Sequence, residues 1–448
     1  MRLRPPKDFC FSRQCNWKEV WHQNRIIRRG ISVARNLWYS DLMTEFAPFY
    51  SQDVSCMQYS AIRRLAKLAL QPGIIGFAAG TPSAETFPAE EIRRIASSIL
   101  ETDAKAALQY GLTLGYAGLI DAVCSFSRAR RAINSTTEEI CITSGSQQAL
   151  DLIGRLFLDP GDVVLVELPS YIGAIAAFRN LQAELVGVRQ AQDGIEIDDL
   201  IARIEACRRA GKKPKLLYVI PNFQNPSGLT VSPAKRRALL EVAARYGLLI
   251  VEDDPYGEVC FETSMDADLR PIKSMDAEGR VIYLSTFSKI LAAGLRVGWI
   301  VAARPVIEKL DLVKQSTDLC GSMFDQRIVA ECLRQGVVER HLPGIREFYK
   351  QKCQMMLASL EQAMPSEVQW TRPAGGLFLW VVLPDRLDSE AILPESIEQA
   401  RVIYVPGHPF HVNNTGRNTL RVAFSKESED NIRAGIHRLA QVFKHHLE

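Results

Sequence analysis

The sequence has little of what marks a membrane, secreted or nucleic-acid-binding protein. It contains no run of about 18 or more apolar residues, the length that a membrane-spanning helix requires. Its first residues, Met1 to Lys7, lack the apolar core of a secretory signal. The net charge of +3 on 448 residues is too small for the strong basic field of a nucleic-acid-binding protein. We therefore expect neither a membrane nor nucleic acid among its partners.

Cysteine is present, but not in a pattern that binds metal or cross-links the chain. The ten cysteines include no Cys-x-x-Cys pair, which argues against both a zinc site and a disulfide framework. We expect no metal, and reduced thiols in a cytoplasmic protein are the simplest explanation. The hydrophobic content of 47% and charged content of 23% are ordinary for a globular protein. A chain of 448 residues predicts two domains rather than one.

Residues 1–40 differ from the rest of the chain in charge. They contain nine lysines and arginines against two acidic residues. This basic extension fits a disordered segment, which is our prediction. An arginine-rich targeting peptide and a basic arm that contacts nucleic acid or a partner remain open.

A phosphate site is indicated where the β-prone run Val281–Leu284 ends. Thr286, Ser288 and Lys289 follow directly, and Arg296 lies seven residues beyond the lysine. Hydroxyl groups and a guanidinium are suitable donors to a phosphate. A lysine beside them can form a Schiff base with the aldehyde of a phosphorylated cofactor. Taken alone, the same residues would also suit a strand end with a solvent-exposed lysine.

Two other predicted strands end in residues that suit a binding site. Ile140–Thr143 is followed by a turn of small residues and a helix that starts near Ser146 and Gln147. The first turn of a helix favours an anion, although an ordinary capped helix explains the pattern as well. Asp253 ends the apolar strand that begins at Leu248. Burying a carboxylate there is costly unless it is paired, which indicates a functional role.

Acidic neighbours and a buried arginine complete the set of candidate charges. Glu252 and Asp254 compete with Asp253, but side chains alternate along a strand, so both should point away from the Asp253 side. Arg421 lies inside the apolar strand 419–425. A buried arginine requires an anionic partner, either an internal carboxylate or a bound one.

Together these motifs resemble those of the class I and II aminotransferases that use pyridoxal phosphate (PLP), and most of all the kynurenine/2-aminoadipate type. The similarity runs from about Asp41 to the C-terminus. It implies the α/β architecture of fold type I, with a mostly parallel sheet of seven-stranded type flanked by helices and a smaller α+β domain. The alternation of strands and helices between residues 90 and 310 favours the same sheet. We predict an arm with part of the small domain at 41–90, a large domain at 91–324 and the rest of the small domain at 325–448.

The resemblance implies a role for each candidate residue. Lys289 would hold PLP and act as the catalytic base, and Asp253 would keep the pyridine nitrogen protonated. The phosphate would be held by Ser146, Gln147, Thr286, Ser288, Arg296 and, in a homodimer with shared active sites, Tyr110 of the partner subunit. The ring would contact Tyr171, Asn225 and Tyr256.

The substrate carboxylate would be bound by Arg421, with Asn225 and Gly80 beside it. Next to Gly80 this sequence departs from the family at Ala79, because the family usually has Gly-Gly where this chain has Ala79-Gly80. Ala79 is still small enough for a close approach of the backbone.

The expected function is transfer of an amino group from an L-amino acid to a 2-oxo acid, most plausibly 2-oxoglutarate. The donor would be of the 2-aminoadipate, aromatic or branched-chain type. The same motifs would serve a PLP-dependent carbon–sulfur lyase, because the first steps are shared. A further alternative is the ligand-sensing domain of a transcription regulator. Such regulators carry an N-terminal winged helix-turn-helix, for which residues 1–40 look too short.

Overall fold

The computed structural model describes residues 46–448 with the exception of 52–53, 55–56, 58–60 and 263–268. The chain divides into two units, residues 1–56 and 57–448. The described part of the first unit contains a short 3-10 helix, η1 (Ala47–Phe49). The basic extension predicted at residues 1–40 lies outside the described residues.

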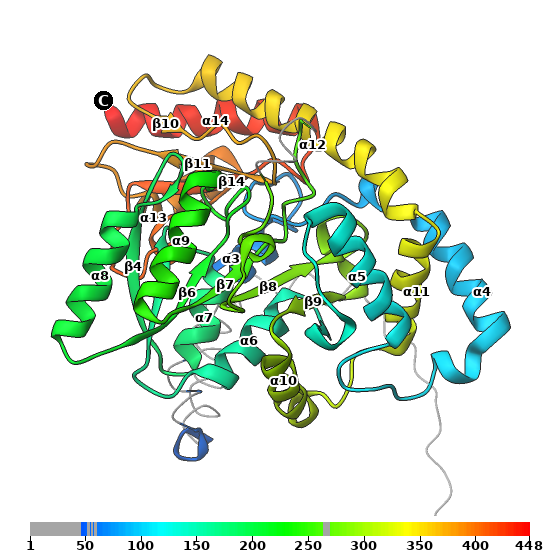
Figure 1. The fold of residues 1–448 in the computed structure, drawn as a ribbon. Helices are drawn as coiled ribbons and strands as arrows, with labels where there is room; N and C mark the ends of the chain where they lie inside the picture. The colour runs from blue at the N-terminus through cyan, green and yellow to red at the C-terminus, as the bar shows by residue number, and fades with distance from the viewer. Residues whose placement is uncertain (1–45, 52–53, 55–56, 58–60, 263–268) are drawn as a thin grey trace, which may run out of the picture. The chain divides into compact units, whose positions relative to one another are not determined.

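An eight-stranded sheet with strand order β2-β9-β8-β7-β6-β3-β4-β5 forms the centre of the second unit (Figure 1). Its strands are β2 (Ile140–Thr143), β3 (Val163–Leu168), β4 (Glu184–Ala191), β5 (Gly194–Ile195), β6 (Pro214–Val219), β7 (Leu249–Asp253), β8 (Val281–Thr286) and β9 (Gly298–Val301). The pairs from β8 to β4 are parallel, whereas β9 is antiparallel to both β8 and β2. β5 forms a hairpin with β4 and adds a two-residue edge strand to the seven strands expected. The predicted mostly parallel sheet is confirmed.

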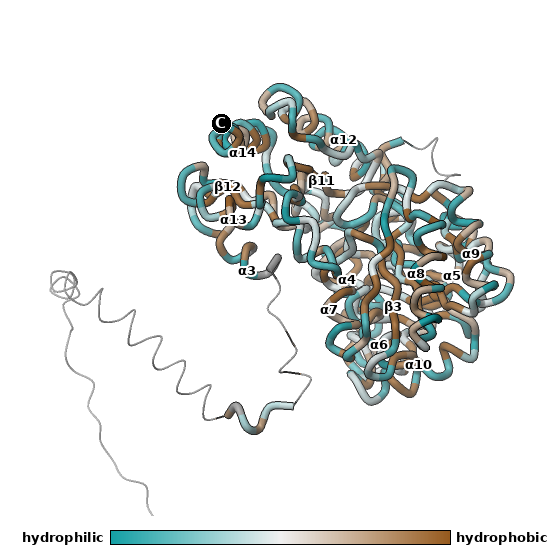
Figure 2. The backbone as a smooth tube through the Cα atoms, turned by 90° about the vertical axis from the view of Figure 1, so that its left-hand side faces the viewer, coloured by the Kyte–Doolittle hydropathy of each residue, from teal (hydrophilic) through white to brown (hydrophobic). Residues whose placement is uncertain are grey.

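Helices cover both faces of the sheet, because its strands carry apolar side chains on both sides. On β3, Leu165 belongs to one hydrophobic cluster, and Val164 and Val166 belong to another. The first cluster includes residues of α8 (Ile197–Arg209) and α9 (Pro233–Tyr246). The second includes residues of α5 (Ala117–Arg131), α6 (Ser146–Phe157), α7 (Ile172–Asn180) and α10 (Arg304–Thr317). Figure 2 shows β3 hydrophobic over most of its length, as expected for a strand buried on both faces.

The C-terminal part forms a second, antiparallel sheet with strand order β10-β11-β14-β13. Its strands are β10 (Gln369–Trp370), β11 (Phe378–Val382), β13 (Val405–Pro406) and β14 (Thr419–Ala423). The long helices α12 (Val337–Ala363) and α14 (Glu429–Leu447) lie side by side near this sheet (Figure 1). The remaining helices are α3 (Ala61–Leu68), α4 (Ala89–Ala107), α11 (Met323–Arg334) and α13 (Ser389–Glu395). The domain boundaries near residues 90 and 324 stay a prediction.

A short parallel pair joins the beginning of this unit to its end. β1 (Ile75–Gly76) pairs with β12 (Val402–Ile403), and the carbonyl of Phe77 accepts a hydrogen bond from the N–H of Ala423. The segment that follows Phe77 therefore lies next to β14. No helix in the described part of the chain is long and apolar enough to cross a membrane.

Strand direction determines where a site can form. Since β9 is antiparallel to both its neighbours, β2 runs in the same direction as β8, β7, β6 and β3. The carboxyl ends of parallel strands meet at one edge, where α/β sheets bind ligands. The segments that follow those ends are 144–147, 169–173, 221–228, 254–256 and 287–289.

Candidate active site

An anion-binding cradle forms where β2 passes into α6. The turn residue Gly145 has φ +81°, and a Cβ atom there would lie 2.5 Å from Nη2 of Arg296. That guanidinium donates to the carbonyl of Ser144 at 2.9 Å, and its Nη1 lies 3.4 Å from Oγ of Ser288. Ser146 Oγ is buried without a hydrogen-bond partner in the described part of the chain. A helix N-terminus, two hydroxyls and a guanidinium thus gather as the sequence predicts.

Two other predicted phosphate contacts are held in place by nearby residues. Thr286 Oγ1 lies 2.8 Å from Oγ of Ser288 and accepts from its backbone N–H at 3.1 Å. The amide of Gln147 donates to the carbonyl of Gly173 at 3.0 Å, and the Tyr171 hydroxyl lies 3.5 Å from the Gln147 oxygen. The side chain of Gln147 therefore connects the start of α6 to Tyr171, and its backbone N–H belongs to the first turn of α6.

Lys289 lies between the cradle and the C-terminal sheet. Its Nζ is 3.5 Å from the carbonyl of Gly80. Burial, with the nearby guanidinium groups of Arg421 and Arg296, lowers the pKa of Lys289 to about 8. The lysine is therefore a much weaker base than an exposed one and carries a substantial neutral fraction near pH 8.

Gly80, whose carbonyl faces this lysine, has no room for a side chain, because a Cβ atom would lie 2.0 Å from the ring of Phe378.

Asp253 ends β7 with one carboxylate oxygen bonded and one free. The hydroxyl of Tyr218 on β6 donates to Oδ2 at 2.8 Å. Oδ1 is buried and has no partner among the described residues. Burial raises the pKa of Asp253 to about 7 even though the bond from Tyr218 and the charge of Lys289 lower it. A free, buried carboxylate oxygen is the arrangement that a cationic ring nitrogen would complete.

The two competing acidic residues have other partners. Glu252 accepts hydrogen bonds from the backbone N–H groups of residues 272–273 at 2.7 and 2.8 Å. Asp254 pairs with Arg131 at 2.5 Å and accepts from the amide of Asn222 at 2.8 Å. Both carboxylates are satisfied within the protein, as the alternation of side chains predicts, and Asp253 is left as the available acid.

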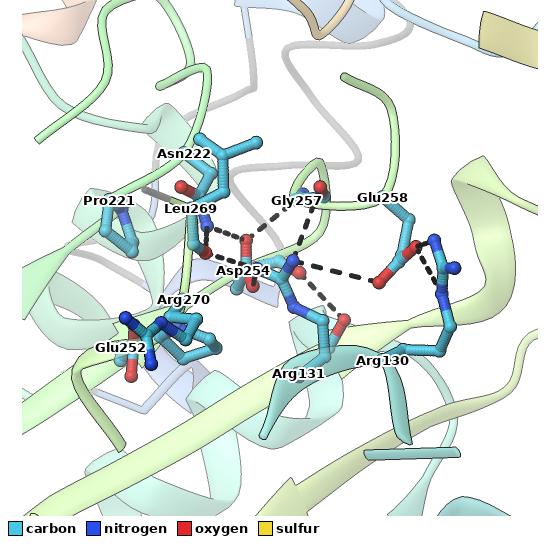
Figure 3. Close-up of polar contacts among 12 residues, drawn as sticks. Arg130, Arg131, Pro221, Asn222, Glu252, Asp254, Gly257, Glu258, Leu269 and Arg270 are labelled. Carbon is cyan, nitrogen blue, oxygen red and sulfur yellow. Dashed lines mark hydrogen bonds and ion pairs between the residues drawn. The ribbon is translucent and has the colours of Figure 1, made fainter. Parts of the chain in front are cut away.

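A buried ionic network lies directly behind this strand end (Figure 3). It continues from Arg131 to Glu258, which also pairs with Arg130 and with Arg346 of α12. From the sequence, Asp254 was considered only as a competitor of Asp253, and Arg131 was not singled out at all. Their partners lie more than a hundred residues away along the chain, so no local pattern could have indicated the pair.

Arg421 on β14 is held by neutral groups and lacks a carboxylate partner in the described part of the chain. It donates to Oδ1 of Asn225 at 2.8 Å and to the carbonyl of Ala78 at 2.7 Å. Its Nε is buried without a partner. The rings of Phe378 and Phe410 lie 4.3 and 5.3 Å from the guanidinium carbon. Burial lowers the pKa of Arg421 to about 10, so an incoming anion would relieve a real desolvation cost. Among the described residues, no carboxylate forms the internal salt bridge with Arg421 that was the alternative.

A chain of contacts connects this arginine to the lysine. Asn225 bridges Arg421 and the hydroxyl of Tyr256, which lies 3.5 Å from its amide nitrogen. The Tyr256 ring in turn lies 5.8 Å from Nζ of Lys289. Burial raises the pKa of Tyr256 above its ordinary value, so its hydroxyl is a hydrogen-bond donor at physiological pH.

Tyr110 is the predicted residue that does not join this group. Its side chain is 79% exposed, so it is not packed into the site of its own chain. Leu108 and Leu112 on the same loop are also largely exposed. This placement leaves the expected role of Tyr110, in the site of a partner subunit, as a prediction.

Comparison with known proteins decides the family. The family model "Aminotransferase class I and II" matches residues 72–439. The chain belongs to this family. Aromatic-amino-acid aminotransferase 1 of Thermococcus litoralis is 43% identical to this aminotransferase over 404 residues, which cover 90% of this chain and 96% of that protein. The 2-aminoadipate transaminase of Thermus thermophilus is 42% identical over 389 residues, with 87% and 94% covered.

Solved structures agree with this assignment. The crystal structure of Pyrococcus horikoshii kynurenine aminotransferase, in complex with PMP, KYN as substrates and KYA as products, superposes with a TM-score of 0.87 at 42% identity. The match covers 91% of this chain and 100% of that one. The protein is thus a PLP-dependent transaminase of fold type I.

The residues of this aminotransferase fit PLP on structural grounds as well. Ser146 Oγ, Asp253 Oδ1 and Arg421 Nε are buried polar atoms without partners in the described residues. Ser146 Oγ lies in the anion cradle, where the phosphate would need a donor. Asp253 Oδ1 lies at the end of β7, where the ring nitrogen would need an acceptor. Arg421 Nε lies where a substrate carboxylate would need a donor. Buried polar groups normally have partners, so unsatisfied ones in a site indicate what it binds.

Several residues of the site escaped sequence analysis. Tyr218, Phe378 and Phe410 each contact a predicted functional residue. For Tyr218 a signal existed, since a single hydroxyl within the apolar run Leu216–Ile220 requires a buried partner. Phe378 lies on an apolar stretch, where aromatic residues are ordinary, and Phe410 lies in His408–His411, where no pattern marks it.

Proposed function

We propose that this aminotransferase moves the amino group of an L-amino acid of the 2-aminoadipate, aromatic or branched-chain type to 2-oxoglutarate. The observation that carries the proposal is the continuous set of contacts from Arg421 through Asn225 and Tyr256 to Lys289. It places a carboxylate-binding guanidinium and an amine of lowered pKa in one site. These are the two groups that removal of an α-proton from an amino acid requires.

The residues that would hold PLP are those predicted from the sequence. Ser146, Gln147, Thr286, Ser288 and Arg296 would hold the phosphate, and Lys289 would attach the cofactor covalently. Tyr171 would stack on the ring, Asn225 and Tyr256 would bond its hydroxyl, and Asp253 would contact its nitrogen. When bound, PLP supplies the electron sink that stabilises a carbanion at the substrate α-carbon.

The remaining chemistry belongs to the protein side chains. Arg421 would bind the substrate carboxylate in two-pronged fashion, oriented by Asn225 and by the rings of Phe378 and Phe410. Lys289 would accept the α-proton as a neutral amine, because its lowered pKa leaves that form available near pH 8. The backbone next to Gly80 would approach the same carboxylate.

The donor class is supported by the side chains that surround Arg421. Phe378 and Phe410 provide apolar walls next to Arg421, which suits a large or aromatic donor side chain. Relatives named for aromatic amino acids and for 2-aminoadipate support the same range.

We further propose a homodimer in the cytoplasm. The apolar side chains of Leu108, Tyr110 and Leu112 are 70%, 79% and 73% exposed, which suits an interface with a second copy. The described cysteines are free thiols, as expected in a reducing compartment.

The direct test is a donor panel. Holoenzyme with 2-oxoglutarate should form glutamate from at least one of 2-aminoadipate, kynurenine, phenylalanine, tyrosine and leucine, measured by mass spectrometry. Lys289→Ala should form none. Release of pyruvate and ammonia from a sulfur-containing donor, without glutamate, would instead support the lyase alternative. The regulator alternative depends on residues 1–40, which lie outside the described residues.

A further inference from the structure

Asp253 receives a single side-chain hydrogen bond in the described structure, and it comes from a residue with no assigned role. Tyr218 lies on β6, where it is level with Val251 of β7. Its side chain is fully buried, and its hydroxyl donates to Oδ2 of Asp253 at 2.8 Å. The other oxygen, Oδ1, has no partner in the described residues. The bond therefore fixes the rotation of the carboxylate and leaves one oxygen available.

We propose that Tyr218 is a positioning residue that keeps the proton shared by Asp253 and the cofactor ring nitrogen on the nitrogen. The inference rests on the proposed function, because it requires PLP in this site. A hydrogen bond donated to a carboxylate stabilises its charged form. A carboxylate stabilised in this way binds the shared proton more weakly, so the ring keeps it and remains a strong electron acceptor.

No other hydroxyl or amide in the described structure donates to Asp253. The titratable groups that act on Asp253 or on Tyr218 electrostatically are Asp254, Lys289, Tyr256, Tyr171 and Glu167. Burial raises the pKa of Asp253, and the charge of Asp254 raises it further. The hydrogen bond from Tyr218 and the charge of Lys289 lower it. In the holoenzyme the nitrogen of Lys289 would belong to the covalent link to PLP, whereas the hydrogen bond from Tyr218 would still oppose protonation of the carboxyl.

The neighbouring strand offers a matched control. Tyr283 on β8 is equally buried, and its hydroxyl donates to Oδ2 of Asp254 at 3.3 Å. Asp254 is already paired with Arg131 and Asn222. Tyr218→Phe and Tyr283→Phe thus each remove a hydroxyl that donates to one of two adjacent aspartates. Of these two aspartates, only Asp253 has an oxygen without a partner in the described residues.

The experiment follows the ring nitrogen itself. Full-length wild type, Tyr218→Phe and Tyr283→Phe are saturated with PLP carrying ¹⁵N in the ring, and the ¹⁵N chemical shift is recorded across pH. In Tyr218→Phe, at pH values where wild type keeps the proton on the ring, the ¹⁵N shift should move toward that of an unprotonated ring, because the proton moves to the carboxyl. Turnover should be about tenfold slower with a smaller change in KM, since a bond to a charged group is lost. Tyr283→Phe should give the ¹⁵N shift of wild type.

A second substitution covers the case that Tyr218→Phe does not fold. A 3,5-difluorotyrosine at position 218 keeps the shape but donates more strongly, and burial raises the pKa of Tyr218 well above its ordinary value, so the hydroxyl stays protonated. It should move the ¹⁵N shift toward that of a fully protonated ring. An unchanged ¹⁵N shift in every Tyr218 variant of an active, PLP-loaded enzyme would overturn this inference alone. Failure of wild type to bind PLP would overturn the proposed function with it.

Discussion

Burial and two guanidinium groups lower the pKa of Lys289 to about 8, and this has a measurable consequence. The neutral amine attacks an aldehyde, and it predominates above the pKa. Loading of the apoprotein with PLP should therefore speed up with rising pH until about pH 8–9 and then level off, whereas an ordinary lysine with a pKa of about 10.4 keeps gaining reactivity. Stopped-flow absorbance measures the rate, and Nα-acetyl-lysine with PLP is the control. A rate that still rises at pH 10 would contradict the account.

Arg421 should govern substrate affinity more than the rate of chemistry. In Arg421→Lys a point charge replaces a planar two-pronged donor held by Asn225 and Ala78. KM for the donor should increase by about tenfold to a hundredfold, with a smaller change in kcat. Steady-state kinetics of Arg421→Lys beside the exposed control Arg372→Lys measures this split. Equal KM values for the two variants would mean that Arg421 does not bind the carboxylate.

The β2–α6 turn depends on a glycine for two separable reasons. Gly145 has a positive φ, and a Cβ atom would also collide with Arg296. Gly161 has a similar φ of +89° but nothing within 4 Å of its Cβ position. Both alanine variants should lose about 1 kcal/mol or more of stability through backbone strain.

Only Gly145→Ala should weaken PLP binding, by about tenfold or more, because it displaces the guanidinium. Equilibrium dialysis of PLP measures this difference. If the two variants bind PLP equally well, Arg296 does not form part of the cradle.

The ionic network behind β7 should contribute strongly to stability. In Arg131→Met the buried carboxylate of Asp254 loses its charged partner, with loss of about 3–5 kcal/mol of unfolding free energy. Urea unfolding followed by circular dichroism measures the loss, with the surface variant Arg93→Ala as control, since Arg93 pairs with Glu90 in full contact with solvent. A loss no larger than in the control would show that Asp254 finds another partner.

Elements with strong local signals could be predicted closely. The helix α9 carries such signals at both ends, because Ser232 caps it, Pro233 starts it and Gly247 ends it with φ +70°. Asp253 and Arg421 were likewise singled out by a charge in apolar surroundings, and Lys289 by the hydroxyl groups and the arginine near it. What the sequence could not reveal were contacts between distant segments. Arg131 meets Asp254, and Phe410 flanks Arg421, only because the sheets bring them together.

At the scale of the whole molecule, the proposed dimer makes a prediction about shared sites. If Tyr110 serves the site of the partner subunit, then Lys289→Ala and Tyr110→Ala protomers complement each other. A mixed dimer has one site with both changes and one with neither. Refolding the two variants together in equal amounts should give about a quarter of wild-type activity, because half of the dimers are mixed and each has one intact site. Activity no higher than the average of the two separate variants would place Tyr110 outside the partner's site.

We propose that Lys289, Asp253, Asn225 and Arg421 act together in one transaminase site. The most direct measurement is the near-visible absorbance of the PLP-loaded protein during a half-reaction with a single amino acid and no acceptor. At least one donor should convert the cofactor band to that of the aminated cofactor, with one 2-oxo acid released per subunit. Addition of 2-oxoglutarate should then restore the original band, and Lys289→Ala should show no such cycle. A band that no donor converts, or pyruvate and ammonia released in its place, would contradict the account.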